Sequence, residues 1–205
     1  LLMDEPLSSL DQQRKLDLLP FIEEICRSSN FPIVYVTHSM NEVLRLADQV
    51  VQLHKGKVQS VLPPHQLSQS AAYLASVERN DLGTIFEGQV TFREEKTGVA
   101  TVKLNFGELS VPLSNTKLGN KVRLFVSAKD VVLALNEPIG LSAQNIMKAS
   151  IAKIDSSRKP YCTVTLDCGG ETIFAEITCN SVERLGLNAG MPIYAIIKAV
   201  AFDAF

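Results

Sequence analysis

The amino-acid sequence predicts an α/β segment followed by an all-β region made of two similar units. Three observations support this fold class. Residues 1–62 alternate apolar strand patterns with amphipathic helix patterns, residues 87–205 alternate with period two between Gly and Asn turns, and the second region repeats after about sixty residues. The 205 residues are 46% hydrophobic and 20% charged, a composition typical of folded globular chains.

Composition also excludes several classes of partner and site. The formal net charge of -2 does not favour nucleic acid or an anionic lipid surface as a partner. The longest apolar run, Met191–Phe202, contains Lys198 and is shorter than the roughly 20 residues that cross a bilayer. We therefore expect no membrane span, although a peripheral partner of a membrane protein is compatible with this composition. No Cys-x-x-Cys pair is present, so ordinary buried thiols in a reducing compartment are expected for Cys26, Cys162, Cys168 and Cys179.

The first strand and helix are predicted from the first thirty residues. Leu1–Met3 is a short apolar strand pattern that ends at Asp4, Glu5 and Pro6. Asp11 is a good N-cap for a helix that runs to about Asn30. Its apolar stripe consists of Leu16, Leu19, Ile22 and Ile25. Pro20 lies inside this pattern and is expected to kink or weaken the helix.

The next elements continue the strand–helix alternation. Ile33–Val36 is fully apolar and β-branched, which is typical of a strand covered on both faces. Ser39 is the expected N-cap of a second helix. Val50–Leu53 is predicted to be a strand, and His54–Lys57 is predicted to be a turn that leads to a further strand over Val58–Val61. This order implies a parallel sheet that continues into residues outside this sequence.

Beyond residue 62 the pattern changes. Residues 63–86 are interpreted as a linker that contains a short helix near Gln66–Ser76. The two repeats then occupy residues 87–138 and 139–205; Thr101–Leu104, for example, matches Thr163–Leu166. Two copies of a five-strand unit predict two small tandem barrels of the oligonucleotide/oligosaccharide-binding (OB) type.

Acidic and histidine side chains follow the two strands of the α/β segment. Asp4 and Glu5 come at the carboxyl end of the first strand, Ser8–Asp11 follows directly, and Thr37-His38 ends the next strand. Ligands of α/β sheets bind at the carboxyl ends of strands. One carboxylate there can hold Mg²⁺ through water, and a second can position or deprotonate an attacking water.

These motifs, in this order and spacing, resemble the nucleotide-binding subunits of ABC transporters. Met3–Pro6 resembles their Walker B segment with its glutamate, Ser8–Asp11 their D-loop, and Val36–Ser39 their switch-histidine segment. The resemblance implies that Asp4 coordinates Mg²⁺ through water, that Glu5 is the general base, that His38 contacts the γ-phosphate of ATP and that Asp11 acts across a dimer interface. His54 and His65 have no partner motif and are interpreted as surface residues.

The same family carries a phosphate-binding loop that these residues do not contain. No Gly-x-x-x-x-Gly-Lys-Ser/Thr segment and no Leu-Ser-Gly-Gly-Gln signature is present, and the chain opens within a strand pattern at Leu1. We therefore expect this chain to be the C-terminal part of an ABC nucleotide-binding subunit, unable to bind or hydrolyse ATP by itself.

Segments of the last sixty or so residues resemble the molbindin (Mop) domain, and Val122–Leu135 resembles the related TOBE domain of importer ATPases. The Mop segments are Leu141–Asn145, the strand pattern Lys148–Ile154, Ile177–Ser181, Leu185–Leu187 and Tyr194–Ala199. The resemblance implies that Ser142, Asn145, Ser181 and Lys198 bind molybdate or tungstate at subunit interfaces, with Thr178 as a further candidate. Gln144 replaces an arginine that is common in the family, which weakens this assignment. From the residues alone, Lys198 could equally be a solvated lysine and Ser181 the cap of a helix near Val182–Leu185.

Together the two resemblances imply the ATP-binding subunit of a molybdate ABC importer. Such a subunit forms a homodimer, uses ATP and Mg²⁺, joins transmembrane permease subunits at the cytoplasmic face of the bacterial inner membrane, and uses its β-domain to sense the oxyanion. Two alternatives stay open at this point. One is an importer ATPase for tungstate, sulfate or a sugar whose TOBE domain is structural; the other is a non-enzymatic oxyanion-binding module.

Overall fold

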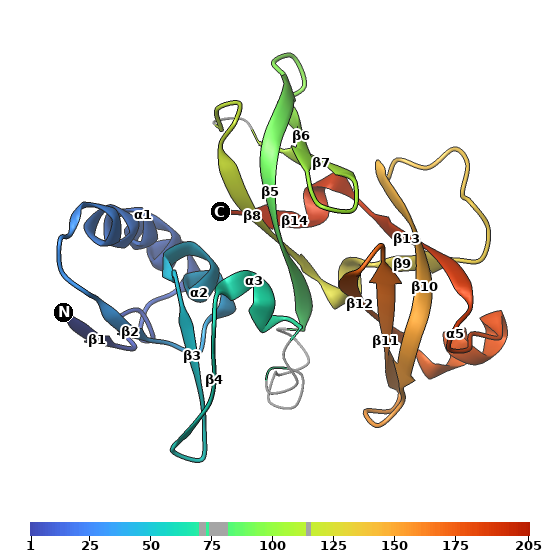
Figure 1. Cartoon of the computed structure of the whole chain (residues 1–205), viewed down its shortest axis with the longest axis horizontal. Coiled ribbons are helices and arrows are strands. Elements are labelled where there is room, and N and C mark those ends of the chain that lie inside the picture. Colours follow the sequence, from blue (N-terminus) through green and yellow to red (C-terminus); the bar gives the residue numbers. More distant parts are fainter. Residues whose placement is uncertain (70–72, 74–81, 114–115) are drawn as a thin grey trace. The chain divides into compact units, whose positions relative to one another are not determined.

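A computed structural model of the chain places residues 1–69, 73, 82–113 and 116–205, except the side chains of Gln12 and Leu16. The chain divides into two compact units, Leu1–Pro64 and His65–Phe205 (Figure 1). Helix α3 (Pro64–Leu67) lies where a linker helix was expected, and the rest of that expected helix falls mostly outside the described residues, as does the side chain of Leu16 in the predicted apolar stripe.

The N-terminal unit contains a two-stranded parallel sheet and two helices. Strand β1 (Leu2–Asp4) pairs with β2 (Val34–Val36), so that Asp4 lies opposite Val36. Helix α1 (Gln12–Ser28) connects the strands and continues through Pro20, and helix α2 (Met40–Leu46) follows β2. Asp11 accepts a hydrogen bond from the Arg14 backbone N–H, and Ser39 accepts one from the Glu42 backbone N–H, which confirms both expected N-caps.

The expected continuation of the parallel sheet is wrong for the third strand. Strands β3 (Val50–His54) and β4 (Lys57–Leu62) form a separate antiparallel hairpin. Lys55 and Gly56 both adopt positive φ values, as a tight two-residue hairpin turn requires, so β3 pairs locally with β4. Because β1 and β2 have no further described neighbour strand, the expectation that Ile33–Val36 is covered on both faces is also wrong: Val34 is 59% exposed.

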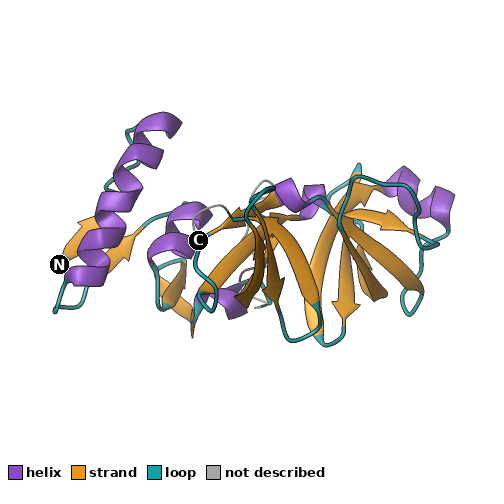
Figure 2. Cartoon of the chain, turned by 90° about the horizontal axis from the view of Figure 1, so that it is seen from above, coloured by secondary structure: helices purple, strands orange, loops and turns teal. Residues whose placement is uncertain are grey.

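The C-terminal unit consists mainly of antiparallel strands (Figure 2). Its first repeat holds β5 (Gly83–Glu94), β6 (Val99–Lys103), β7 (Glu108–Pro112), β8 (Lys121–Ser127), a 3-10 turn (Ala128–Asp130) and β9 (Val132–Ala134). Its second repeat holds β10 (Asn145–Asp155), β11 (Tyr161–Cys168), β12 (Glu171–Thr178), helix α5 (Cys179–Leu185), β13 (Pro192–Ile197), a 3-10 turn (Ala199–Ala201) and β14 (Phe202–Ala204).

The two repeats exchange their last strands. The sheet orders are β14-β8-β5-β6-β7 and β12-β11-β10-β13-β9, so each sheet takes its edge strand from the other repeat. Both sheets contribute to one buried apolar cluster, which contains Leu124 and Val102 from the first and Leu166 and Ile197 from the second. This confirms the expected fold class of an α/β part followed by two five-stranded β-units; each unit is a half-barrel, and the reciprocal exchange of strands is a feature that the sequence did not reveal.

The register of the repeat differs from the sequence match. A one-residue bulge follows Val90 in β5 and Ile151 in β10, so these two residues are equivalent. Val90 pairs with Val102 and Ile151 with Leu166, which aligns Thr101–Leu104 with Thr165–Cys168. The match of Thr101–Leu104 to Thr163–Leu166 is therefore wrong by two residues. A shift of two residues keeps every side chain on the same face, so period-two patterns cannot detect it.

The expectation of four thiols is wrong for two of the cysteines. Cys162 and Cys179 form a disulfide, with Cα atoms 5.3 Å apart, whereas Cys26 and Cys168 are thiols. The two partners are 17 residues apart in sequence and meet because β11 and β12 pair there. Burial raises the pKa of the Cys168 thiol to about 11, so this group stays protonated at neutral pH.

Candidate functional site

The side chains of Glu5 and His38 meet at the carboxyl ends of β1 and β2. His38 Nδ1 lies 3.0 Å from Glu5 Oε1, although 33 residues separate them in sequence. The parallel pairing continues one residue past the strands, since the Glu5 backbone N–H donates to Val36 O at 2.9 Å. Glu5 has a φ of 42°, a left-handed conformation that is uncommon for a residue with a side chain. The sequence-predicted pair of carboxylate and histidine is thus assembled by the sheet.

The Glu5 carboxylate sets the electrostatics of this pair. It raises the pKa of His38, first through the hydrogen bond and second through its charge, while Lys15 acts weakly in the opposite direction. A carboxylate only accepts hydrogen bonds, so the facing Nδ1 must carry a proton. The pair therefore presents a ring that holds its positive charge to a higher pH than a free histidine, beside an exposed carboxylate.

Asp4 and Asp11 lie at the two ends of the loop that leaves β1. Asp4 is exposed at the end of β1, where one carboxylate suits Mg²⁺ that keeps several of its own waters. Within the described parts of the chain no three acidic, His or Cys side chains gather into a metal-binding group. Asp11 caps α1 through the Arg14 backbone N–H and forms an ion pair with the Arg14 side chain at 3.3 Å.

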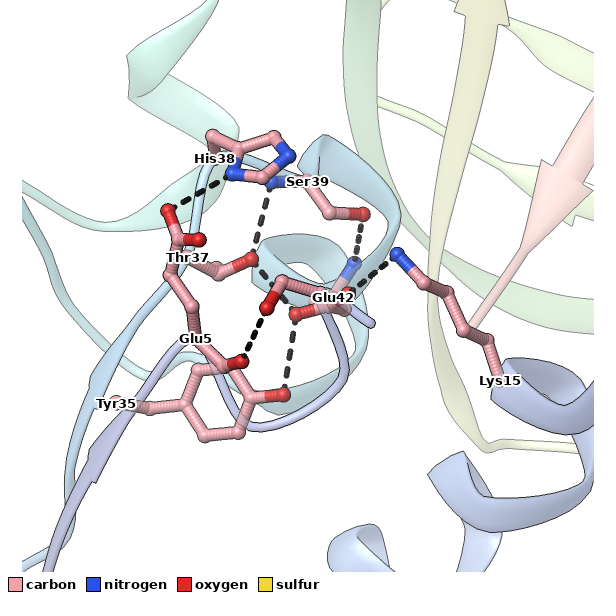
Figure 3. A network of polar contacts seen from close by, with 8 residues as sticks. Glu5, Lys15, Tyr35, Thr37, His38, Ser39 and Glu42 are labelled. Carbon is pink, nitrogen blue, oxygen red and sulfur yellow. Dashed lines mark hydrogen bonds and ion pairs between the residues drawn. The ribbon is translucent and has the colours of Figure 1, made fainter. Parts of the chain in front are cut away.

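Glu42 is a further residue of this region whose role sequence reasoning missed. It is 3% exposed and lies at the start of α2, where the hydroxyls of Tyr35 and Thr37 donate to it (Figure 3). The available signal was the Ser39-x-x-Glu42 spacing, which is that of a capping box. Burial and the Glu42 hydrogen bond raise the pKa of the Tyr35 phenol, so that it remains a donor.

Three of the predicted oxyanion ligands lie at one end of the second half-barrel. Asn145 opens β10 and pairs with Ile197, the residue before Lys198, and Ser142 precedes β10 by three positions. Ser142 and Lys198 are exposed. The Asn145 side chain is instead buried and engaged: its amide accepts from the Ser110 N–H at 2.7 Å and donates to the Ser110 carbonyl at 3.0 Å.

The repeat explains why Asn145 is engaged in this way. Thr84 occupies the equivalent position of β5, and its hydroxyl accepts from the Phe174 N–H at 3.1 Å. Ser110 and Phe174 are equivalent residues of β7 and β12, so each repeat uses one buried polar side chain to bind an edge strand of the other. Asn145 therefore has a structural task within the chain, independent of any ligand.

The remaining predicted ligand, Ser181, lies at the other end of the same half-barrel. Thr178 pairs with Tyr161 at the end of β12, and the whole length of the 11-residue strand β10 separates this end from Asn145. Thr178, and not Ser181, caps α5: its hydroxyl accepts from the Ser181 N–H at 3.2 Å and lies 2.9 Å from the Ser181 hydroxyl. Within one chain, Ser181 therefore does not join Ser142 and Lys198 in a single site.

Comparisons with known proteins agree with both halves of this description. Residues 141–203 match the TOBE domain family. The chain is 40% identical to the molybdenum import ATP-binding protein ModC of Mesorhizobium japonicum over 203 residues, which cover 99% of this chain and 55% of that protein. It is also 40% identical to ModC of Rhizobium johnstonii over 204 residues, covering 100% of this chain and 57% of that protein. The chain thus spans about half the length of these curated relatives.

A solved structure resembles the β-rich part. The cytoplasmic molybdate-binding protein ModG, with molybdate bound, superposes with a TM-score of 0.53 and 27% identity over 59% of this chain and 94% of its own. No helix among the described residues is long and apolar enough to cross a membrane. Over nearly its whole length, the chain is homologous to the C-terminal portion of the ModC molybdenum import ATP-binding proteins, and its residues 141–203 form a TOBE domain.

Proposed function

We propose that this chain is the C-terminal part of the ATP-hydrolysing subunit of a molybdate ABC importer. The observation that carries the proposal is the contact of 3.0 Å between Glu5 and His38 at adjacent strand ends, in a chain whose relatives are import ATP-binding proteins. In this proposal two subunits pair with each other and with transmembrane permease subunits at the cytoplasmic face of the inner membrane.

In this proposal each of the four predicted residues has its own role in ATP hydrolysis. Glu5 accepts the proton of the attacking water, and His38, whose pKa the Glu5 carboxylate raises, presents a donor to the γ-phosphate oxygens. Asp4 would hold Mg²⁺ through water, and the bound ion would supply positive charge beside the phosphates. Asp11 caps α1 at the loop through which the second subunit would be contacted.

The test supplies the part of the protein that these residues do not contain. We would join the amino-terminal portion of Mesorhizobium japonicum ModC to this chain and measure ATP hydrolysis. Glu5→Gln is expected to lower kcat by about 10²–10⁴-fold, the usual contribution of a general base, while ATP binding persists. Glu87→Gln, in the C-terminal unit, is the matched control. An active chimaera whose kcat is insensitive to Glu5→Gln, or ATP hydrolysis by the 205 residues alone, contradicts the proposal.

We further propose that the C-terminal unit senses molybdate or tungstate. The support is its likeness to molybdate-bound ModG. Ser142 and Lys198 lie at one end of a half-barrel and Thr178 and Ser181 at the other, so the proposed site is completed by a second copy of the chain. A tetrahedral dianion suits this mixture of hydroxyls, backbone N–H groups and one lysine.

Calorimetry with molybdate, tungstate and sulfate separates this proposal from its alternatives. We expect molybdate and tungstate to bind the chain, Lys198→Ala to weaken binding, and Lys153→Ala to leave it unchanged. Molybdate should also slow ATP hydrolysis by the transporter, and Lys198→Ala should remove that inhibition. Binding of sulfate alone, or of no anion, favours an importer of another solute, and molybdate binding without any ATPase activity in the chimaera favours a non-enzymatic module.

A further inference from the structure

A buried carboxylate lies behind the exposed Glu5–His38 pair. Glu42 is 3% exposed, and an isolated buried charge is costly unless it is hydrogen-bonded. Two hydroxyls satisfy it, and both reach the same oxygen: Tyr35 OH lies 3.0 Å and Thr37 Oγ1 2.7 Å from Oε2. The other oxygen, Oε1, faces the Lys15 ammonium of α1 at 3.9 Å.

These contacts close a ring of hydrogen bonds around the backbone of His38. Thr37 donates its hydroxyl to Glu42 and accepts the Ser39 backbone N–H at 3.0 Å. Ser39 in turn accepts the Glu42 backbone N–H at 3.4 Å. Of the two chain neighbours of His38, Thr37 is thereby tied to the Glu42 carboxylate, and Ser39 is tied to Thr37 and to the Glu42 backbone (Figure 3).

The pair itself has little packing of its own. The His38 and Glu5 side chains are 74% and 46% exposed, and Glu5 adopts a positive φ. An exposed ring can occupy several rotamers, and whether one of them reaches Glu5 depends on where the turn places the His38 backbone.

We infer that Glu42 is a positioning residue, whose carboxylate fixes the Thr37–Ser39 turn so that His38 faces Glu5. Its importance for catalysis rests on the ATPase function proposed above, whereas its effect on the His38–Glu5 contact does not. A competing role is to tie α1 to α2 through Lys15, and the geometry separates the two roles because the hydroxyls and Lys15 use different oxygens.

The variants follow from this division. Glu42→Gln keeps one oxygen for both hydroxyls and removes the charge that Lys15 faces. Glu42→Leu removes the acceptor, and Thr37→Val removes the link to Glu42 and Ser39 with nearly the same side-chain shape. Lys15→Met removes the contact of α1 with Glu42 Oε1 and leaves both hydroxyl bonds to Oε2 in place.

The experiment uses NMR of the 205-residue chain with ¹⁵N-labelled histidine to determine which ring nitrogen of His38 carries the proton. The chain has three histidines, and the exposed His54 serves as an internal reference. At a pH where the rings are neutral, contact with Glu5 requires the Nδ1–H form of His38, whereas a histidine without a partner favours Nε2–H. We expect Nδ1–H in the unchanged chain, in Glu42→Gln and in Lys15→Met, and loss of it in Glu42→Leu and Thr37→Val.

Other results overturn the inference. If His38 keeps the Nδ1–H form in folded Thr37→Val, the Glu42 link does not set the direction of the ring. The same conclusion holds if His38 loses the Nδ1–H form in Lys15→Met. If Glu42→Leu unfolds the N-terminal unit, the result for Thr37→Val alone decides whether the link to Glu42 fixes the direction of His38. In the chimaera, Thr37→Val should lower kcat on the order of 100-fold with KM for ATP unchanged, as expected for a misplaced catalytic group. A further outcome separates the two proposals. If Glu5→Gln leaves kcat of the chimaera unchanged while Thr37→Val still changes the His38 tautomer in the 205-residue chain, the ATPase proposal is contradicted and the positioning role of Glu42 stands.

Discussion

The protonation of His38 depends mainly on one neighbour, Glu5. Because the pKa of His38 is raised by Glu5, the pair contributes stability fully below a pH of about 6.5, the value of an unperturbed histidine, and loses it as the pH rises through the raised pKa. We expect Glu5→Gln to move the His38 titration midpoint down toward that of an unpaired histidine. An NMR pH titration of the labelled chain measures this shift.

His54 provides the control for this measurement, since it is exposed in the separate β3–β4 hairpin and its signals should not respond to Glu5→Gln. A His38 midpoint that is the same with and without the Glu5 carboxylate would show that the two side chains do not pair in solution.

Strand β14 belongs in space to the first half-barrel. Phe202 pairs with Val126 of β8, is 6% exposed and contacts the Phe86 ring with centroids 6.4 Å apart. We expect Phe202→Ala to lower the free energy of unfolding by about 3–5 kcal/mol, the usual cost of removing a buried aromatic ring. Hydrogen exchange should show lost protection in β8 rather than in β13. Denaturant unfolding measures the change in the free energy of unfolding, and hydrogen exchange shows which strand loses protection.

The matched control is Phe92→Ala on β5, whose side chain is 60% exposed and should change stability by less than about 0.5 kcal/mol. Selective loss of protection in β13 after Phe202→Ala would mean that the last strand stays with its own repeat.

The disulfide links β11 to the first residue of α5. Closing a loop of this length, with a sequence separation of 17, stabilises a fold by about 3 kcal/mol in the chain-entropy description. We expect a reductant to lower the denaturation midpoint of the chain, and Cys26→Ser to leave this response unchanged because Cys26 is a thiol. Unfolding curves with and without reductant measure the difference.

Alkylation before reduction gives an independent check, with Cys162 and Cys179 protected from the reagent. Labelling of all four cysteines in the denatured, unreduced chain, together with unfolding that does not respond to a reductant, would show that the bond does not form.

The two units differ in how much apolar surface they bury. Among described residues of the N-terminal unit, Leu7, Leu19 and Leu44 are the buried hydrophobic side chains, while Leu2, Phe21 and Leu53 are more than 60% exposed. The buried apolar cluster of the C-terminal unit draws on both of its sheets. Since buried apolar area is the main source of stability, we expect residues 1–64 to lose hydrogen-exchange protection at a lower denaturant concentration than residues 83–205. Simultaneous loss across both units would contradict this expectation.

Local signals explain how much of this molecule can be predicted from sequence. The caps Asp11 and Ser39, the hairpin turn at Lys55-Gly56 and the period-two strands depend on neighbouring residues, and these predictions agree with the structure. Two of the failures concern contacts between distant residues. The repeat register was wrong by two residues because alternation does not fix it, and the disulfide was missed because strand pairing had to bring its cysteines together.

The sequence by itself determined the order of elements, the two repeats and the residue types at the strand ends, because short-range periodicity and capping encode these. Tertiary structure alone decided that β9 and β14 change places, that Asn145 is engaged with Ser110, and that Glu42 lies behind His38. The strand exchange and the Asn145 contact depend on which backbone donors and acceptors two distant segments offer each other, whereas the place of Glu42 depends on the hydroxyls of Tyr35 and Thr37. Hydrogen-bond satisfaction is a property of the folded whole, and no local pattern records it.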